Sequence, residues 1–492
     1  MNSRDLKKAT APGWNFDNSY ARLPECLYVR LDPTPVKAPQ LALFNRPLAE
    51  SLGLNADRLA GEDGAAIFSG NRLPAGAEPL AQAYAGHQFG HFTMLGDGRA
   101  HLLGEQFTPK GARFDIQFKG SGQTPFSRNG DGRAALGPML REYLISEAMH
   151  ALGIPTTRSL AVVTTGQPVY REIPLPGAIL TRVAASHIRV GTFEYLAAQK
   201  NREALRTLAE YTIHRHFPEA MQTDNPFLSF LQAVLERQAA LVARWLQVGF
   251  IHGVMNTDNM ALSGESIDFG PCAFMDRYDP ATVFSSIDHG GRYAYGRQPA
   301  VAQWNLSRFA ETLVPLLDTE ENKAIERANG VINSYPEVFR RFWLTGMRAK
   351  LGLLNEEEED GALVLDLLSC MEKCGADYTN SLRELALETL PEAPLFSDPE
   401  FRQWHGRWQA RLGRQKEPVE ESRRLMRAHN PAVIPRNHRV EAALTAAEEG
   451  DLSVLRRLLE VLGNPYEERP EYDAYRQPAP PSACAYQTFC GT

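Results

Sequence analysis

Cysteine is scarce in this sequence, and long apolar runs are absent. Six cysteines occur among 492 residues, too few for a dense disulfide framework, which favours a reducing compartment with mostly unpaired thiols. No apolar stretch approaches the about 18 residues that a membrane-spanning helix needs. Residues 1–8 (MNSRDLKK) are not followed by the apolar segment of a secretory signal. We therefore expect a cytoplasmic protein that does not interact with membranes.

The sequence also lacks an excess of positive charge. Lysine and arginine number 52 against 59 aspartates and glutamates, for a formal net charge of −7. Proteins whose main partner is nucleic acid usually have a basic surface. Hydrophobic residues make up 43% of the chain and charged residues 23%, which excludes a disordered or fibrous protein. We expect a globular monomer with no nucleic-acid partner.

Strand and helix patterns divide the chain near residue 191. Residues 81–190 are rich in glycine and alternating strands, and residues 191–385 show helical apolar spacing. Residues 1–80 are expected to be an extension that packs on this core, and residues 386–492 a helical extension with a cysteine-containing tail. This order is compatible with an α+β fold of two lobes, a small β-rich N-lobe and a larger helical C-lobe around a nucleotide cleft. Together with the Asn and Asp-Phe-Gly motif of residues 252–270, it predicts a protein-kinase-like fold.

The periodicity of apolar residues, and the glycines and prolines that end helices and strands, also predict individual elements. Apolar residues alternate over residues 114–119, which places Lys119 at the end of a strand on its opposite face. Strands are expected at residues 159–165 and 179–183, with a turn around residues 166–168. Helical spacing and stop signals predict helices over residues 41–52, 136–152, 202–216, 226–248, 320–330, 336–354, 361–373, 399–412 and 438–462.

The strongest local motif is residues 252–259 (HGVMNTDN) followed by residues 267–270 (IDFG). Asn259 and Asp268 carry hard oxygen ligands, and a hairpin between them would bring both to one divalent metal. Mg²⁺ or Mn²⁺ bound to nucleotide phosphates suits such a pair, as in protein-kinase-like folds. The alternative is a hairpin in which both side chains only cap turns.

One residue argues against ordinary kinase chemistry. In a kinase-like His-Gly-Asp loop the third residue is the aspartate that orients the substrate hydroxyl, and here that residue is Val254. Asp258 instead stands directly before Asn259. The protein is therefore either catalytically inactive or uses a relocated carboxylate.

Lys119 and Glu142 form a second candidate pair. Glu142 lies on the predicted helix that follows the Lys119 strand, and kinases use such a lysine to hold nucleotide phosphates and such a glutamate to position the lysine. A strand-end lysine by itself is usually only exposed. The metal motif downstream favours a role for Lys119 in binding nucleotide phosphates.

Other candidates share the ability to bind phosphate. Paired glycines let backbone N–H groups approach phosphate, and arginine provides a fork of donors. Tight turns and structural ion pairs are the alternatives. These candidates are Gly96, Gly98, Arg99, Asp131, Gly132, Arg182 and Arg189.

Taken together, these motifs resemble the SelO family, also called YdiU, which consists of protein nucleotidyltransferases with a pseudokinase fold. The similarity extends to residues 14–24 (WNFDNSYARLP), 84–90 (YAGHQFG) and 117–128 (QFKGSGQTPFSR), and to the chain end at residues 490–492 (CGT). It covers essentially the whole chain.

The resemblance implies transfer of AMP from ATP, or of UMP from UTP, to hydroxyl side chains of proteins. It implies that the nucleotide is reversed relative to kinases, so that the α-phosphate faces the acceptor. Asp258 matches the catalytic base, and Asn259 and Asp268 match the metal ligands. The seven phosphate-binding candidates and Lys119 match nucleotide-binding positions.

Two alternatives and one regulatory hypothesis stay open. The protein could be an inactive ATP-binding scaffold, or a kinase that transfers the γ-phosphate. Cys490 could form a redox-sensitive disulfide with Cys272, two residues past Gly270; alternatively, both are ordinary thiols. Cys370 and Cys374 are expected to share one buried helix face.

Overall fold

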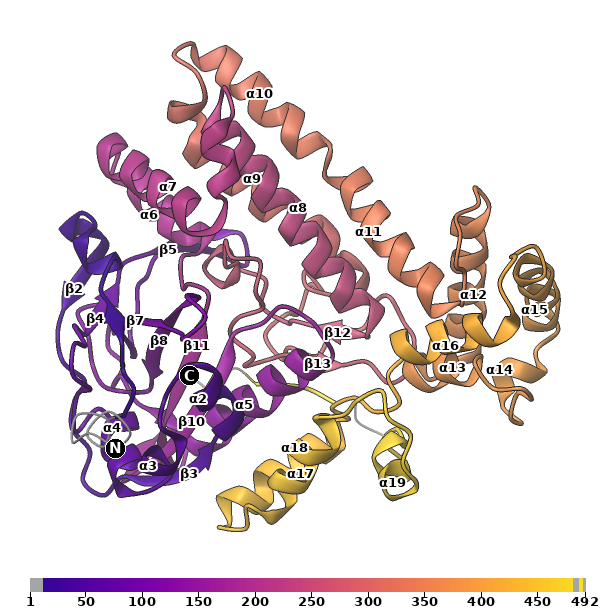
Figure 1. Ribbon diagram of the computed structural model, residues 1–492, viewed down its shortest axis with the longest axis horizontal. Helices are drawn as coiled ribbons and strands as arrows, with labels where there is room; N and C mark the ends of the chain where they lie inside the picture. Colours follow the sequence, from indigo (N-terminus) through magenta and orange to yellow (C-terminus); the bar gives the residue numbers. More distant parts are fainter. Residues whose placement is uncertain (1–11, 481–485, 490–492) are drawn as a thin grey trace, which may run out of the picture.

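A nine-stranded sheet organises the N-terminal part of the computed structural model, which describes residues 12–480 and 486–489 (Figure 1). The strands run in the order β2-β4-β7-β8-β11-β10-β3, with β1 paired to β7 and β9 paired to β11. Their bounds are β1 Phe16–Asp17, β2 Tyr28–Arg30, β3 Gln40–Phe44, β4 Leu80–Gln82, β7 Ala100–Phe107, β8 Arg113–Lys119, β9 Ala134–Ala135, β10 Arg158–Tyr170 and β11 Pro174–Ala184.

Each face of this sheet has its own hydrophobic core. Ile116 and Phe118 of β8 lie two residues apart and pack into the cluster formed with the short helices α2 (Arg46–Ser51), α3 (Ala56–Leu59) and α4 (Glu62–Phe68). The opposite face packs against α5 (Leu136–Ala151). Because side chains alternate along a strand, Lys119 belongs to the face that α5 covers. The predicted strand and helix are confirmed here.

The predicted helix over residues 41–52 is wrong in its first part. Residues 41–44 belong to β3, which pairs with β10, and α2 begins only after Asn45, whose side chain accepts a hydrogen bond from the Leu48 backbone N–H at 3.1 Å. Pairing with a distant strand outweighed the local helical spacing. The sheet thus includes strands from the first 80 residues.

The predicted turn around residues 166–168 is also wrong. The β10–β11 ladder passes through it with a register shift and continues to Tyr170 opposite Pro174. Gly166 has φ +67° and lies against Ala38, so this glycine serves a bulge and not the hairpin turn.

Helices build the rest of the chain, and most predicted ones are present (Figure 1). The predicted helix at 438–462 is two helices, because Gly450 has φ +100° after α17. Both, α17 and α18, pack against α5 of the N-terminal part. The helices are α6 Val190–Ala198, α7 Arg202–His216, α8 Pro226–Gln247, α9 Gln298–Leu317, α10 Glu321–Asn333, α11 Tyr335–Lys350, α12 Asp360–Cys374, α13 Tyr378–Glu384, α14 Pro394–Ser397, α15 Pro399–Leu412, α16 Val419–His429, α17 Asn437–Glu448, α18 Ser453–Leu462 and α19 Asp473–Arg476.

Two short strand pairs complete the fold. β5 (Ala85–Gln88) and β6 (His91–Met94) form a separate hairpin, and β12 (Phe250–Ile251) pairs with β13 (Ala273–Phe274). The residues between β12 and β13 include the HGVMNTDN motif and a 3-10 turn, η4 (Thr257–Asn259). Within the described ranges, no helix is long and apolar enough to cross a membrane.

Candidate active site

Four charged side chains, three of them buried and Asp268 half-buried, form a network between the sheet and the segment that follows β12. Lys119 Nζ donates to Glu142 Oε2 at 2.7 Å and also pairs with Asp268 Oδ1. Arg182 of β11 pairs with Glu142 through Nε and donates from Nη2 to Asp268 Oδ1 at 2.7 Å. The network therefore joins β8, α5, β11 and the IDFG segment, and it contains the Lys119–Glu142 pair that the sequence predicted.

Electrostatics fixes the charge state of this network. Burial alone would raise the pKa of Asp268, but the adjacent Lys119 and Arg182 outweigh burial and hold that pKa well below its usual range. The same two cations lower the pKa of Glu142 against the effect of burial. Asp268 also has φ +67°, a conformation rare for a residue with a side chain. The ion pairs hold this carboxylate, ionised, in one orientation.

Asp258 lies in η4 in a different environment. Burial raises its pKa to about 6, while Arg189 and Gln88 act in the opposite direction. Its Oδ1 atom is buried and has no hydrogen-bond partner among the described residues. Gly86 of β5 lies so close that a Cβ there would be 2.2 Å from this oxygen. Asp258 is thus a carboxylate with an unused acceptor and a pKa near neutrality.

Arg189 closes the site on the other side of Asp258. It is the N-cap residue that precedes α6, it donates from Nη1 to the Asp258 carbonyl at 3.3 Å, and its guanidinium lies over the Tyr84 ring at 4.3 Å. Its Nη2 atom is buried and unpartnered in the described structure. A buried guanidinium with an unused donor is suited to bind an anion.

One cavity of about 570 Å³ is lined by Lys119, Arg182, Arg189, Asp258 and Asp268, whereas Glu142 lies behind this wall. The volume is typical of sites for small molecules. Among the described residues, seven basic side chains line it against four acidic ones, which favours an anionic ligand. Ten residues singled out in the sequence lie in its wall: Gly96, Gly98, Arg99, Lys119, Asp131, Gly132, Arg182, Arg189, Asp258 and Asp268.

Gly96 shows why a glycine is needed in this wall. Its φ is +137°, and a Cβ at this position would be 2.3 Å from the Phe126 ring. Any larger residue would have to move the loop that follows β8. Asp131 is placed differently from a simple phosphate-loop residue, since its carboxylate pairs with Arg171 at 2.8 Å.

The predicted metal ligands are only partly brought into the cavity wall. Asp268 lines the cavity and Asn259 does not. Asn259 Nδ2 donates to the Val254 carbonyl at 3.0 Å, which leaves the amide oxygen of Asn259 as a ligand atom. Within the described residues, no strand ladder joins Asn259 to Asp268, so the expected hairpin is not formed. A turn links them instead, in which the Gly264 N–H donates to the Ala261 carbonyl at 3.1 Å. Two hard oxygen donors fit Mg²⁺ or Mn²⁺ if phosphate oxygens complete the shell.

Sequence reasoning missed several wall residues. Tyr84 and Gln88 lie in the YAGHQFG motif, which the sequence alone indicates only as part of the family resemblance. The Tyr84 ring contacts Arg189, and the Gln88 side chain hydrogen-bonds Asp258. Arg171 lies at the turn between β10 and β11 and reaches the cavity across the sheet. Nothing in the local sequence around Arg171 signals this position.

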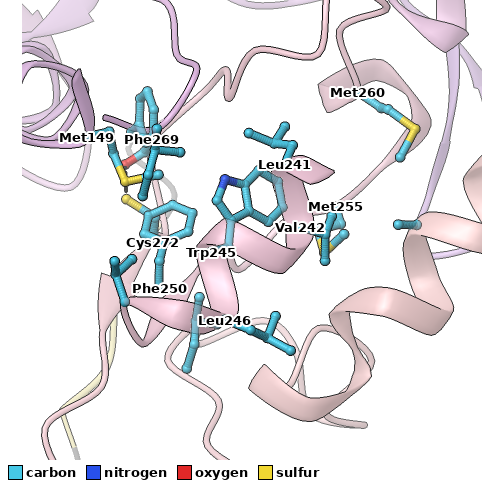
Figure 2. Packing of buried hydrophobic residues seen from close by; sticks show 14 of the residues in the cluster. Met149, Leu241, Val242, Trp245, Leu246, Phe250, Met255, Met260, Phe269 and Cys272 are labelled. Atoms are coloured by element: carbon cyan, nitrogen blue, oxygen red, sulfur yellow. Dashed lines mark hydrogen bonds between the residues drawn. The ribbon is translucent and has the colours of Figure 1, made fainter. Parts of the chain in front are cut away.

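Cys272 is a buried thiol four residues after Asp268. Figure 2 shows it among Met149, Phe250 and Phe269 in the hydrophobic core. Burial raises its pKa to about 12. Cys490 lies outside the described residues, so the Cys272–Cys490 disulfide stays a prediction. The described tail does pass nearby, because Thr488 Oγ1 donates to the Pro271 carbonyl at 2.7 Å.

Comparisons with known proteins show which family the chain belongs to. Residues 12–463 match the family described as "Protein adenylyltransferase SelO". Three similar proteins are each named "Protein nucleotidyltransferase YdiU". The protein of Syntrophotalea carbinolica is 72% identical over 98% of both chains. That of Brevibacillus brevis is 63% identical over 99% of this chain and 100% of its own, and that of Geobacillus kaustophilus is 62% identical over 98% and 99%. The chain therefore belongs to the SelO family of protein adenylyltransferases, which are nucleotidyl-transferring enzymes.

Proposed function

We propose that this protein transfers AMP from ATP to serine, threonine or tyrosine hydroxyls of other proteins and releases pyrophosphate. The same reaction with UTP in place of ATP would transfer UMP. The fold that carries it is a kinase-like pair of lobes, in which the β-rich part and the helical part enclose the cavity. The observation that supports this most directly is the cavity wall, in which the buried cations Lys119, Arg182 and Arg189 lie together with the carboxylate of Asp258.

In the proposed reaction the acceptor hydroxyl attacks the α-phosphorus. A new phosphorus–oxygen bond forms to the acceptor, the bond between the α-phosphorus and the bridging oxygen of the β-phosphate breaks, and the hydroxyl proton passes to Asp258. A carboxylate whose pKa is about 6 is a reasonable acceptor for that proton near neutral pH.

Negative charge accumulates on pyrophosphate as it leaves. Lys119 and Arg182 are held by Glu142 and Asp268 before any nucleotide arrives, so these cations need little rearrangement to stabilise that charge. Arg189 offers its unpartnered Nη2 atom to the same phosphates. A reversed nucleotide, with its terminal phosphates against these cations, leaves the α-phosphorus nearer to Asp258.

A divalent ion would be held by Asp268 and Asn259. Its chemistry there would be to neutralise phosphate charge and fix the triphosphate conformation. Asp268 is kept ionised by its cationic neighbours, which suits it for this role. Mg²⁺ and Mn²⁺ both match an oxygen-only donor pair.

The test uses ATP labelled at either the α- or the γ-phosphorus, with Mg²⁺ or Mn²⁺ and unfolded β-casein as a general acceptor. The proposal predicts label on protein only from the α-position. Asp258→Asn should abolish transfer and keep nucleotide affinity within about threefold, whereas Asp57→Asn, a control at an exposed position, should change neither. Label only from the γ-position would identify a kinase. Bound ATP without any transfer would identify a scaffold.

A further inference from the structure

The β5–β6 hairpin presents one unpaired edge beside the active site. Its turn is formed by Phe89 and Gly90, with φ of 51° and 89°, which is the two-residue geometry that matches strand twist. Within the described part of the chain, β6 pairs with β5 and with no other strand. Its other edge is therefore unpaired among the described residues, and three of its four residues are exposed.

The register identifies the backbone groups on that edge. Leu95 N–H donates to the Tyr84 carbonyl at 3.0 Å, and hydrogen-bonded pairs alternate along an antiparallel ladder. Thr93 and His91 therefore face β5 with their backbone groups. Phe92 and Met94 direct their N–H and C=O groups outward, and no described residue bonds to them.

The inner edge of the hairpin is fastened to the loop that carries Asp258. His87 N–H donates to Thr257 Oγ1 at 2.6 Å, and Phe89 N–H donates to Asn256 Oδ1 at 3.1 Å. The carboxylate of Glu194 bonds both His87 Nδ1 and Thr257 Oγ1 at 2.5 Å. The open edge of β6 is thus fixed in space relative to the candidate base.

The side chains of this edge are also unusually apolar. Phe92 is 45% exposed and Met94 is 47% exposed, and both lie on the same face of the strand. His87 packs between Phe92, at a ring separation of 5.4 Å, and Trp304 of α9, at 5.3 Å. An exposed apolar edge strand invites pairing with another chain, and proteins usually protect such edges.

The hairpin meets the cavity at the last residue of β5 and directly beyond the end of β6, while residues 91–94 of β6 are not themselves in the cavity wall. Gln88, opposite His91 at the start of β6, lines the cavity, and so do Leu95 and Gly96 directly after its end. Strands pair at a spacing of about 4.8 Å, so a segment laid along β6 would pass the cavity mouth at Leu95. A residue a few positions along that segment would then enter the cavity.

We propose that the open edge of β6 binds the protein acceptor as an extended strand, which places a neighbouring hydroxyl residue of the acceptor near Asp258. This inference rests on the proposed function, since it names how the acceptor of that reaction is held. Backbone groups of Phe92 and Met94 would supply the hydrogen bonds, and the Phe92 side chain an apolar contact. Recognition of backbone favours unfolded or extended acceptor segments over folded ones and tolerates many sequences.

The test removes one outward N–H group. Met94→Pro deletes the N–H that would bond the acceptor, and proline is tolerated at an edge position whose N–H faces solvent. Met94→Ala is the matched control, because it removes the side chain and keeps the N–H. Transfer of α-labelled AMP to unfolded β-casein, nucleotide affinity and the melting temperature are measured for both variants.

We expect kcat/KM for β-casein to fall at least tenfold in Met94→Pro and by no more than about threefold in Met94→Ala, with nucleotide affinity and melting temperature retained. Transfer by Met94→Pro at the unaltered rate would overturn strand addition and leave the proposed function standing. Equal losses in both variants would assign the contact to the side chain and overturn backbone pairing. Absence of α-label transfer in the unaltered protein would overturn the proposed function, and this inference with it.

Discussion

A single methyl group added at Gly86 should displace the carboxylate of Asp258. The added Cβ would be 2.2 Å from Asp258 Oδ1, whereas ordinary contact begins at 3.4 Å, so the carboxylate must move by about 1.2 Å. Gly86 carries no positive φ, so alanine introduces no backbone strain there. A misplacement of about 1 Å can lower a rate by about 10²-fold, which corresponds to about 2.7 kcal/mol in the activation free energy.

The assay for Gly86→Ala compares kcat for AMP transfer with the affinity for nucleotide. We expect kcat to fall about 100-fold while nucleotide affinity changes little, because the phosphate-binding cations are on other elements. Gly406→Ala is the control, since nothing lies within 4 Å of a Cβ at that exposed position. Full activity of Gly86→Ala, with unchanged stability, would refute the view that the hairpin backbone positions Asp258.

Three further predictions concern buried charges and thiols. Glu142→Gln removes a negative charge beside the buried Lys119 and should lower the free energy of unfolding by about 3–5 kcal/mol. Denaturant titration measures this change, and an unchanged unfolding midpoint would contradict the assigned ion pairs. Burial lowers the pKa of Lys350 to about 7, so between about pH 7 and 10 folding releases the proton of Lys350 and the native state gains stability as pH rises. Lys350→Met should remove that gain, which is on the order of 3 kcal/mol from pH 7 to 10. The melting temperature is measured against pH for both proteins, and parallel profiles for Lys350→Met and the unaltered protein would refute this prediction. Because Cys272 is fully buried with a pKa of about 12, iodoacetamide at pH 8 should alkylate the half-buried Cys26 much faster, as mass spectrometry of tryptic peptides would show.

Strong local signals predicted most elements, and distant pairing decided the exceptions. The helix over residues 136–151 followed from apolar residues four apart, which any amphipathic helix needs in order to pack. The segment over residues 41–44 has similar apolar content but forms a strand, because β10 offers it a partner. Gly166 marked a local irregularity correctly, yet sequence could not distinguish a bulge from a turn, since glycine suits both.

The candidate site, too, could be predicted from the sequence only in part. Motif spacing identified Lys119, Glu142, Asp258 and Asp268, because their residue types are characteristic of phosphate and metal chemistry. It did not identify Gln88 as a neighbour of Asp258, nor the role of the hairpin that carries it. Those contacts join residues about 170 positions apart, and no periodicity reports such a distance.

The sequence by itself determined the family, the α+β composition and the chemical character of the site, because these depend on residue types and short spacings. The tertiary structure decided which of these residues meet. It alone placed Arg182 between Glu142 and Asp268 and left Asp258 with an unused oxygen. It also left one edge of β6 open, because pairing, burial and pKa depend on neighbours that folding brings from distant parts of the chain.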